Sequence, residues 1–241
     1  MSIADNLRRV RERIAAAADS CGRTVDEIML VGVTKYVGVA EAGELISAGC
    51  PDLGESRPQE LWAKSGELAS ASGDSHTHLP PRWHLIGHLQ RNKIRRTLPL
   101  VALIHSVDSL RLLAAIDADA RAIAEIGDNI SSPVRLLLEV NTSGESAKQG
   151  LAPDEVEPLL VAATTYPSVA ICGLMTMAAL DGGPEVAVRN FAMLRDLRDR
   201  LRPLAPKCVR LDELSMGMSG DFEIAIREGA TIVRVGSALW E

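Results

Sequence analysis

Met29-Leu-Val-Gly-Val-Thr-Lys35 is the first strongly apolar run of this chain, and it ends on a lysine. A short apolar run bounded by polar residues predicts a buried strand, so Lys35 stands where that strand leaves the core. Apolar surroundings disfavour a charged ammonium and lower the pKa of a lysine. The neutral amine is the form that attacks an aldehyde, which makes Lys35 a candidate nucleophile. Lys35 could equally be the first solvated residue after the strand, since polar residues commonly follow strands.

Seven further stretches predict strands, and helical patterns separate them. With the first run, the expected strands cover residues 29–34, 52–53, 82–86, 101–106, 134–140, 169–175, 211–215 and 231–235. The expected helices cover residues 39–48, 59–69, 89–96, 110–126, 154–165, 186–201 and 222–228. A further helix is predicted over residues 3–20, because Ile3, Leu7, Val10 and Ile14 follow helical spacing.

This alternation predicts the fold. Strands that alternate with helices form a parallel sheet joined by right-handed crossovers. Eight such strands fit a closed (β/α)8 barrel of the TIM type better than an open sheet. We therefore expect a single barrel domain over residues 1–241, with the helix at 3–20 added to it. The polar segment 70–81 is expected to be a mobile loop of this barrel rather than a domain linker.

Composition excludes several classes of function. The formal net charge of −6 argues against general nucleic-acid binding, which depends on cationic contacts with phosphates. The N-terminal residues contain no apolar signal segment, and no run is long enough to span a membrane. Cys21, Cys50, Cys172 and Cys208 are widely separated, so we expect reduced thiols and a cytoplasmic protein.

Two histidines and a basic patch carry weaker signals. His84 and His88 are four residues apart, which would suit a metal ion on a helix. Because His84 falls in a predicted strand and an acidic third ligand is missing, no metal site is expected. A solvated helix face accounts for the basic patch. The patch comprises Arg91, Lys93, Arg95 and Arg96.

Leu214-Ser-Met-Gly-Met-Ser-Gly-Asp221 lies between a predicted strand and a helix. Its small residues would let the backbone approach a ligand, and free amides at the next helix could hold an anion. An ordinary turn with Ser219 as helix N-cap is the alternative interpretation. A second glycine-serine pair, Gly236-Ser237, follows the last predicted strand, and the loops after strands seven and eight of such barrels often form a phosphate site.

An imine-forming lysine opposite a phosphate cradle suggests pyridoxal 5′-phosphate, whose aldehyde and phosphate occupy different positions of one ring. Arg234 precedes the glycine of the last loop and could point at the ring between these anchors. An arginine donates to a pyridine nitrogen but cannot accept from it, so the nitrogen would stay unprotonated. A salt bridge in the barrel interior is the alternative role for Arg234.

Motifs spread over the whole chain add a resemblance. They are Val31-Gly-Val-Thr-Lys35, Trp83-His-Leu-Ile-Gly-His-Leu-Gln-Arg-Asn-Lys93, Ile104-His-Ser-Val-Asp108, Val140-Asn-Thr-Ser-Gly144, Gly173-Leu-Met-Thr-Met177, Leu214-Ser-Met-Gly-Met-Ser219 and Val233-Arg-Val-Gly236. Together they resemble the pyridoxal-phosphate homeostasis protein family. The resemblance implies a barrel similar to the N-terminal domain of alanine racemase, with the cofactor held as an imine on Lys35. It also implies a set of cofactor-binding residues, namely Lys35, Ser56, His84, Ser215, Gly217, Met218, Ser219, Arg234, Gly236 and Ser237.

Two departures from the family pattern stand out. The family usually reads Gly-Glu-Asn where this chain has Gly54-Glu55-Ser56, which puts a direct amide contact with the cofactor in doubt. The ending Ala238-Leu-Trp-Glu241 lacks the family's Phe-Gly-Ala-Arg tail, so the last helix of the barrel is expected to stay unformed.

The function expected is that of a cytoplasmic, non-catalytic carrier that buffers pyridoxal phosphate and supplies apo-enzymes, as a monomer or weak dimer. Racemases of the similar fold need a second acid or base from another domain, which is not expected here. The alternatives are a racemase-like enzyme using Lys35 with Tyr36 or Tyr166, a class I aldolase using Lys35 alone, and a scaffold without ligand. Lys148 could contact phosphate or accept an aldehyde transiently.

Overall fold

The computed structural model describes residues 2–71, 80–127, 133–145, 149–179, 181–206 and 209–241. Eight parallel strands close into a barrel in chain order, as the sequence predicts. The ring closes where β1 pairs with β8, with Val31 opposite Arg234. The strands are β1 Met29–Val33, β2 Asp52–Glu55, β3 Arg82–Leu85, β4 Val101–Val107, β5 Val134–Glu139, β6 Val169–Met175, β7 Glu213–Ser215 and β8 Ile232–Val235.

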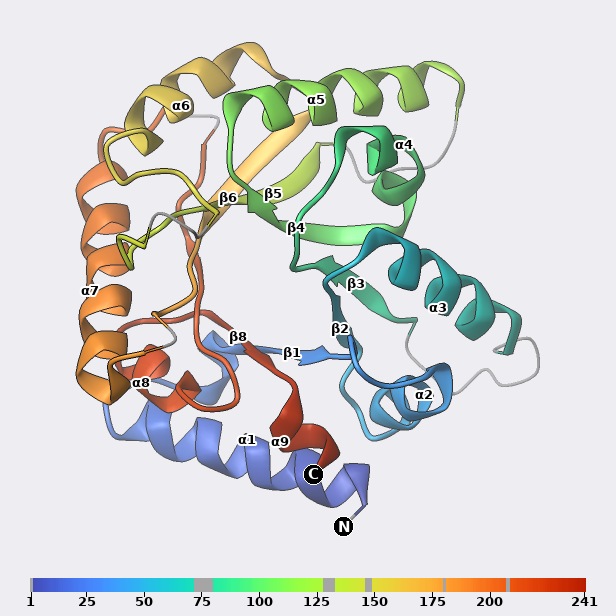
Figure 1. Cartoon of the computed structure of the whole chain (residues 1–241), viewed down its shortest axis with the longest axis vertical. Coiled ribbons are helices and arrows are strands. Elements are labelled where there is room, and N and C mark those ends of the chain that lie inside the picture. Colours follow the sequence, from blue (N-terminus) through green and yellow to red (C-terminus); the bar gives the residue numbers. More distant parts are fainter. Residues whose placement is uncertain (1, 72–79, 128–132, 146–148, 180, 207–208) are drawn as a thin grey trace.

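Helices surround this barrel (Figure 1). The α-helices are α1 Ile3–Asp19, α2 Val39–Ser47, α3 Pro58–Ala71, α4 Ile94–Thr97, α5 Leu110–Glu125, α6 Val156–Ala162, α7 Gly183–Leu201, α8 Phe222–Arg227 and α9 Ser237–Trp240. Short 3-10 helices are η1 Val25–Glu27, η3 Arg91–Lys93, η4 Leu98–Leu100 and η5 Ala163–Thr165. None of the helices in these described ranges is both long and apolar enough to cross a membrane.

The extra helix α1 packs across the barrel's first and last units, where α8 and α9 lie beside it in Figure 1. Its apolar face contains the predicted Leu7, Val10 and Ile14, each at most 2% exposed. The amide nitrogen of Asn6 donates to the Leu239 carbonyl of α9 over 3.0 Å. This helix therefore joins the two ends of the chain.

Two sets of side chains fill the core. Outward-facing strand residues pack against the helices, and a small separate apolar cluster from β1, β4, β5, β6 and β8 fills part of the interior. Most barrels of this kind have an interior dominated by branched apolar residues. Here the inward positions also hold His84, His105, Ser215 and Arg234, each at most 4% exposed. Buried polar groups need partners, so these four side chains must form hydrogen bonds within the interior.

The boundaries differ from the sequence expectations in a few places. The helix expected over 89–96 forms as η3 followed by the four-residue α4, and the one expected over 154–165 as α6 followed by η5. The expectation that the last helix stays unformed is wrong. α9 forms because Leu239 is fully buried and the Trp240 indole donates to the Val33 carbonyl over 3.0 Å. The loop expected at 70–81 falls largely on residues outside the described ranges.

Candidate functional site

Four neighbouring strand ends carry most of the predicted site. Around the closed ring the order is β2, β1, β8 and β7. Ser56 follows β2, Lys35 follows β1 and Gly236 follows β8, while Ser215 ends β7 and the segment from Met216 follows it. Because the strands are parallel, all four ends open on the same face of the barrel. The structure thus brings these residues together at the barrel's C-terminal face.

Lys35 itself is exposed. Strand β1 ends at Val33, Thr34 is fully buried, and Lys35 begins the turn that leads to α2. Its ammonium nitrogen lies 4.8 Å from the centroid of the Tyr36 ring. Of the two interpretations of Lys35, the structure agrees with a solvated residue after the strand rather than with apolar surroundings, because the turn carries the side chain out to water. The amine is accessible to an incoming molecule.

A buried ion pair holds the turn that carries Lys35. Lys64 of α3 is 6% exposed, and its ammonium donates to the Thr34 carbonyl over 2.6 Å and to Glu55 Oε1 over 2.5 Å. The Thr34 hydroxyl donates to the same carboxylate oxygen over 2.7 Å. The sequence reasoning missed Lys64, although its place between Leu61 and Leu68 on the apolar face of the helix is a usable signal.

The loop after β7 presents unpaired backbone donors. Gly217 has φ +94°, which favours glycine, and an added Cβ would lie 2.6 Å from the Ala225 Cβ. Within the part of the chain that the structure describes, the backbone N–H groups of Gly217, Ser219 and Gly220 have no hydrogen-bond partner. Backbone N–H groups left without partners in one loop can bind an anion.

A serine joins the loops after β7 and β8. The Ser219 hydroxyl oxygen accepts from the backbone N–H of Gly236 over 3.0 Å and of Ala238 over 3.4 Å. The alternative in which Ser219 caps the next helix is wrong, because Asp221 is the N-cap residue of α8. Ser237 and Met218 are exposed beside this junction. The two loops thus form one continuous polar surface.

Arg234 occupies the interior below this surface. Its guanidinium donates to the Ser215 hydroxyl over 2.6 Å and to the Thr176 carbonyl over 3.0 Å. Burial lowers the pKa of Arg234 to about 10, although Glu139 and Asp221 raise it. The guanidinium therefore remains charged at neutral pH. Among the described residues, no carboxylate lies within salt-bridge distance of Arg234. The structure therefore does not support a salt bridge as its alternative role.

His84 and His105 extend the polar interior away from Arg234. His105 Nδ1 lies 2.8 Å from the Ser215 hydroxyl oxygen, and His105 Nε2 lies 2.9 Å from His84 Nδ1. His84 Nε2 lies 3.1 Å from Asp52 Oδ1. Both ring nitrogens of His84 are engaged, so a direct hydrogen bond to a ligand would require one of these contacts to break. No group of three or more metal-ligand side chains occurs among the described residues.

Glu139 is a further group that the sequence reasoning did not select. It ends β5 and is 5% exposed. Burial and the nearby Asp108 raise the pKa of Glu139 to about 7, against the opposing effect of Arg234. Nothing in the run Leu136–Val140 distinguishes this glutamate from an ordinary strand-end residue. Lys148, which the sequence suggested as a second amine, lies outside the described residues.

These parts combine an accessible amine, a set of unpaired backbone donors and a buried cation at one mouth. A primary amine can condense with an aldehyde, backbone N–H groups bind phosphate, and an arginine donates to a ring nitrogen. The arrangement therefore suits a small molecule that carries an aldehyde, a phosphate and an aromatic nitrogen.

Comparison with known proteins finds a family model, curated relatives and solved structures that match nearly the whole chain. The family model described as "Alanine racemase, N-terminal domain" matches residues 2–241. The "Pyridoxal phosphate homeostasis protein" of Aquifex aeolicus (strain VF5) is 38% identical over 240 residues, covering 100% of this chain and 98% of that protein. The crystal structure of an unknown protein from Bifidobacterium adolescentis matches with a TM-score of 0.88 and 40% identity, covering 98% of this chain and 94% of that one. PipY of Synechococcus elongatus PCC7942, in its structure with PLP bound, matches with a TM-score of 0.82 and 32% identity over 100% of both chains.

Proposed function

The chain belongs to the pyridoxal phosphate homeostasis protein family, and we propose that it binds pyridoxal 5′-phosphate at the C-terminal face of the barrel. The observation that carries this proposal is the gathering of Lys35, the unpaired N–H groups after β7 and the buried Arg234 at neighbouring strand ends. The PLP-bound PipY structure supports it from a relative that matches over its whole length.

The residues present fit this cofactor. A buried glycine N–H without a partner is costly, and a phosphate oxygen would satisfy the donor of Gly217 together with those of Ser219 and Gly220. A guanidinium has five N–H donors, and Arg234 uses two of them in its bonds to Ser215 and Thr176, leaving donors for an acceptor on the ring. The chemistry of the donor set thus matches the cofactor at both its phosphate and its ring nitrogen.

Each of these site residues then has a distinct role. When bound, the cofactor supplies an aldehyde that bonds reversibly to a primary amine. Lys35 provides that amine from an exposed turn, and the Lys64–Glu55 pair fixes the turn beneath it. Arg234 donates to the ring nitrogen and keeps it unprotonated, because a guanidinium does not give up its proton near neutral pH. An unprotonated ring nitrogen withdraws electrons more weakly than a protonated one.

The biological role we propose is that of a carrier. Relatives over the full length are named for pyridoxal phosphate homeostasis, so we assign buffering of the cofactor and its supply to apo-enzymes. A racemase-like role finds little support: Tyr166 precedes β6, at the barrel end opposite Lys35, and Tyr36 lies on the same turn as Lys35. We further propose a cytoplasmic location, consistent with free Cys21, Cys50 and Cys172, and a monomer or weak dimer.

An absorption titration with pyridoxal phosphate tests the proposal. Addition of the cofactor should produce a new band in the wild-type protein and in Lys93→Ala, a control that removes an exterior lysine. Lys35→Ala should keep its far-ultraviolet circular dichroism but lose the band. A band that survives in Lys35→Ala, or no band in any of the three proteins, would overturn the proposed role of Lys35. Transfer from the loaded protein to an apo-enzyme then separates a carrier from a catalyst.

A further inference from the structure

A single chain of hydrogen bonds crosses the barrel interior and ends on Arg234. Its members are Asp52 on β2, His84 on β3, His105 on β4, Ser215 on β7 and Arg234 on β8. Consecutive members are joined by contacts of 3.1, 2.9, 2.8 and 2.6 Å. All five residues are at most 5% exposed, so water does not substitute for these contacts.

The charges at the two ends fix the direction of the first and last hydrogen bonds. A guanidinium can only donate and an ionised carboxylate can only accept. Burial alone would raise the pKa of Asp52, but the hydrogen bonds from His84 and Arg82 lower it to about 2, so Asp52 is an anion at neutral pH. Burial, together with the charges of His84 and Arg234, lowers the pKa of His105 well below its usual value, so that ring is neutral.

The donors therefore all point from Arg234 toward Asp52. Arg234 donates to Ser215, and the Ser215 hydroxyl hydrogen goes to His105 Nδ1. His105 Nε2–H donates to His84 Nδ1, and His84 Nε2–H donates to the carboxylate. In the reversed order, Ser215 would accept from two partners and its own buried hydrogen would find no acceptor. A buried donor left without a partner costs about 1–3 kcal/mol, so the reversed order is disfavoured.

The Asp52 end of the hydrogen-bond chain lies at the barrel's N-terminal face, opposite the candidate site. Asp52 and Arg82 are the first residues of β2 and β3, and Arg82 donates to both carboxylate oxygens of Asp52. Both residues line a cavity of about 1040 Å³ between α1 and the barrel's N-terminal end. The Arg82 side chain is 56% exposed, so this ion pair is open to solvent.

We propose that Asp52, His84, His105 and Ser215 are positioning residues that orient Arg234 toward the cofactor ring, under the control of the Arg82–Asp52 ion pair at the opposite face. This inference rests on the proposed function for the identity of the ring. The orientation of Arg234 in the hydrogen-bond chain does not depend on the cofactor, because Arg234 cannot rotate without breaking its bonds to Ser215 and Thr176. A change at the N-terminal face thus reaches the site through five side chains.

The first test uses the ligand-free protein and does not depend on cofactor binding. Nitrogen-15 NMR distinguishes which ring nitrogen of a histidine carries hydrogen. At pH 7 His84 and His105 should each carry hydrogen on Nε2, and His105 should carry none on Nδ1. Hydrogen on Nδ1 of His105, or a doubly protonated ring of His105, would overturn the proposal whether or not the protein binds pyridoxal phosphate.

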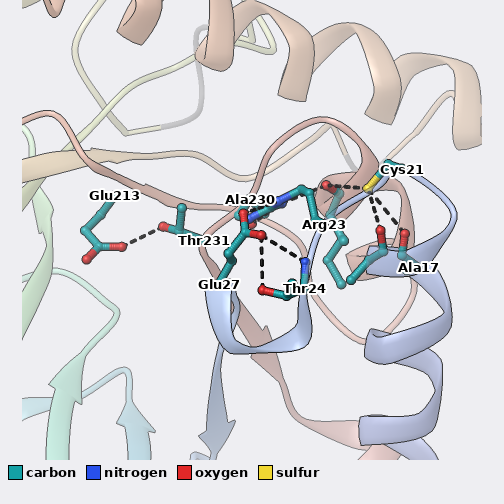
Figure 2. A network of polar contacts seen from close by, with 10 residues as sticks. Ala17, Cys21, Arg23, Thr24, Glu27, Glu213, Ala230 and Thr231 are labelled. Carbon is teal, nitrogen blue, oxygen red and sulfur yellow. Dashed lines mark hydrogen bonds and ion pairs between the residues drawn. The ribbon is translucent and has the colours of Figure 1, made fainter.

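The second test perturbs the far end and reads the near end. Asp52→Asn neutralises the carboxylate, and Glu213→Gln is its matched control. The Glu213 carboxylate lines the same cavity and accepts from the Thr231 hydroxyl over 2.6 Å, but it lies outside the chain (Figure 2). Asp52→Asn should change the hydrogen pattern of His105 in the ligand-free protein, shift the absorption maximum of the bound cofactor and weaken its binding about tenfold.

Glu213→Gln should leave these three readouts unchanged. Equal responses in the two variants would mean that Asp52 acts only through general stability, and no response in Asp52→Asn would mean that the far end does not control Arg234. Either result would overturn the proposal. A wild-type protein that shows the expected histidine pattern but no cofactor band would instead refute the proposed function and leave the hydrogen-bond chain standing.

Discussion

Glu139→Gln should stabilise the ligand-free protein at neutral and alkaline pH. Burial and Asp108 raise the pKa of Glu139 from 4.5 to about 7. Each pKa unit is worth about 1.4 kcal/mol, so holding this carboxylate ionised costs the folded state roughly 3 kcal/mol. The glutamine variant keeps the shape of the side chain and removes that cost.

The sign of the pH dependence follows from the raised pKa. Below about pH 4.5 the group is protonated in both the folded and the unfolded chain, so the ionisation of Glu139 contributes nothing to the difference between the proteins. As pH rises through this range the unfolded chain ionises first, and the wild-type protein loses stability relative to the variant. The full difference is reached above about pH 7, where the folded protein also carries the charge.

Thermal and urea unfolding at pH 5 and pH 8 measure this difference. A domain of this size shifts its Tm by about 2–4 °C per kcal/mol, so the variant should melt roughly 6–12 °C above the wild-type protein at pH 8, with a much smaller gap at pH 5. Glu125→Gln, at an exposed position at the end of α5, is the control and should show no such pH-dependent gap. A Glu139→Gln variant whose stability relative to wild type does not change with pH would show that Glu139 is not held in a costly ionised state.

Three further substitutions test the site and its support. Gly217→Ala should lower stability by about 1–3 kcal/mol and weaken cofactor binding, because an alanine at φ +94° is strained, whereas Gly220→Ala meets nothing within 4 Å and should change stability little in thermal melts. Lys64→Ala should lower the free energy of unfolding in urea by about 3–5 kcal/mol, because it leaves Glu55 buried without its partner. A double variant with Lys64→Met and Glu55→Gln should lose less, and an equal loss would contradict the ion-pair explanation. Asp52→Asn should lower the free energy of unfolding by about 2 kcal/mol at pH 7, because the pKa of Asp52 is lowered from 3.8 to about 2 in the folded protein. This stabilisation is present above about pH 4 and disappears as pH falls through about 2. A stability difference between variant and wild type that persists below about pH 2 would contradict this explanation.

The barrel could be predicted because its signal is local. Each strand is a short apolar run and each crossover helix repeats apolar residues at helical spacing, so the order of elements follows directly. Boundaries were less predictable where tertiary packing decides. α9 forms in spite of its four residues because Leu239 is buried and Trp240 bonds to β1, neither of which the run Ser237–Glu241 reveals.

The residues at the open end of the site could also be predicted from the sequence, whereas the hydrogen-bonded residues of the interior could not. Strand ends of a parallel barrel share one face, so the sequence alone groups Lys35 with the glycine-serine loops. His105 lies in a motif visible in the sequence, but its partner Ser215 is 110 residues away, and no local pattern predicts that contact. Exposure of Lys35 is equally a tertiary property, set by where the turn after β1 leads.

Borohydride reduction of the protein loaded with pyridoxal phosphate, followed by peptide mass spectrometry, shows which lysine bonds to the cofactor. Reduction makes the bond between an amine and the cofactor's aldehyde permanent, so the peptide that carries the added mass identifies the amine. We expect a single pyridoxyl group on Lys35, with Lys64 unmodified because its ammonium is held by Glu55 and the Thr34 carbonyl. Modification of Lys64 in place of Lys35, or a protein without any modified lysine, would contradict this expectation.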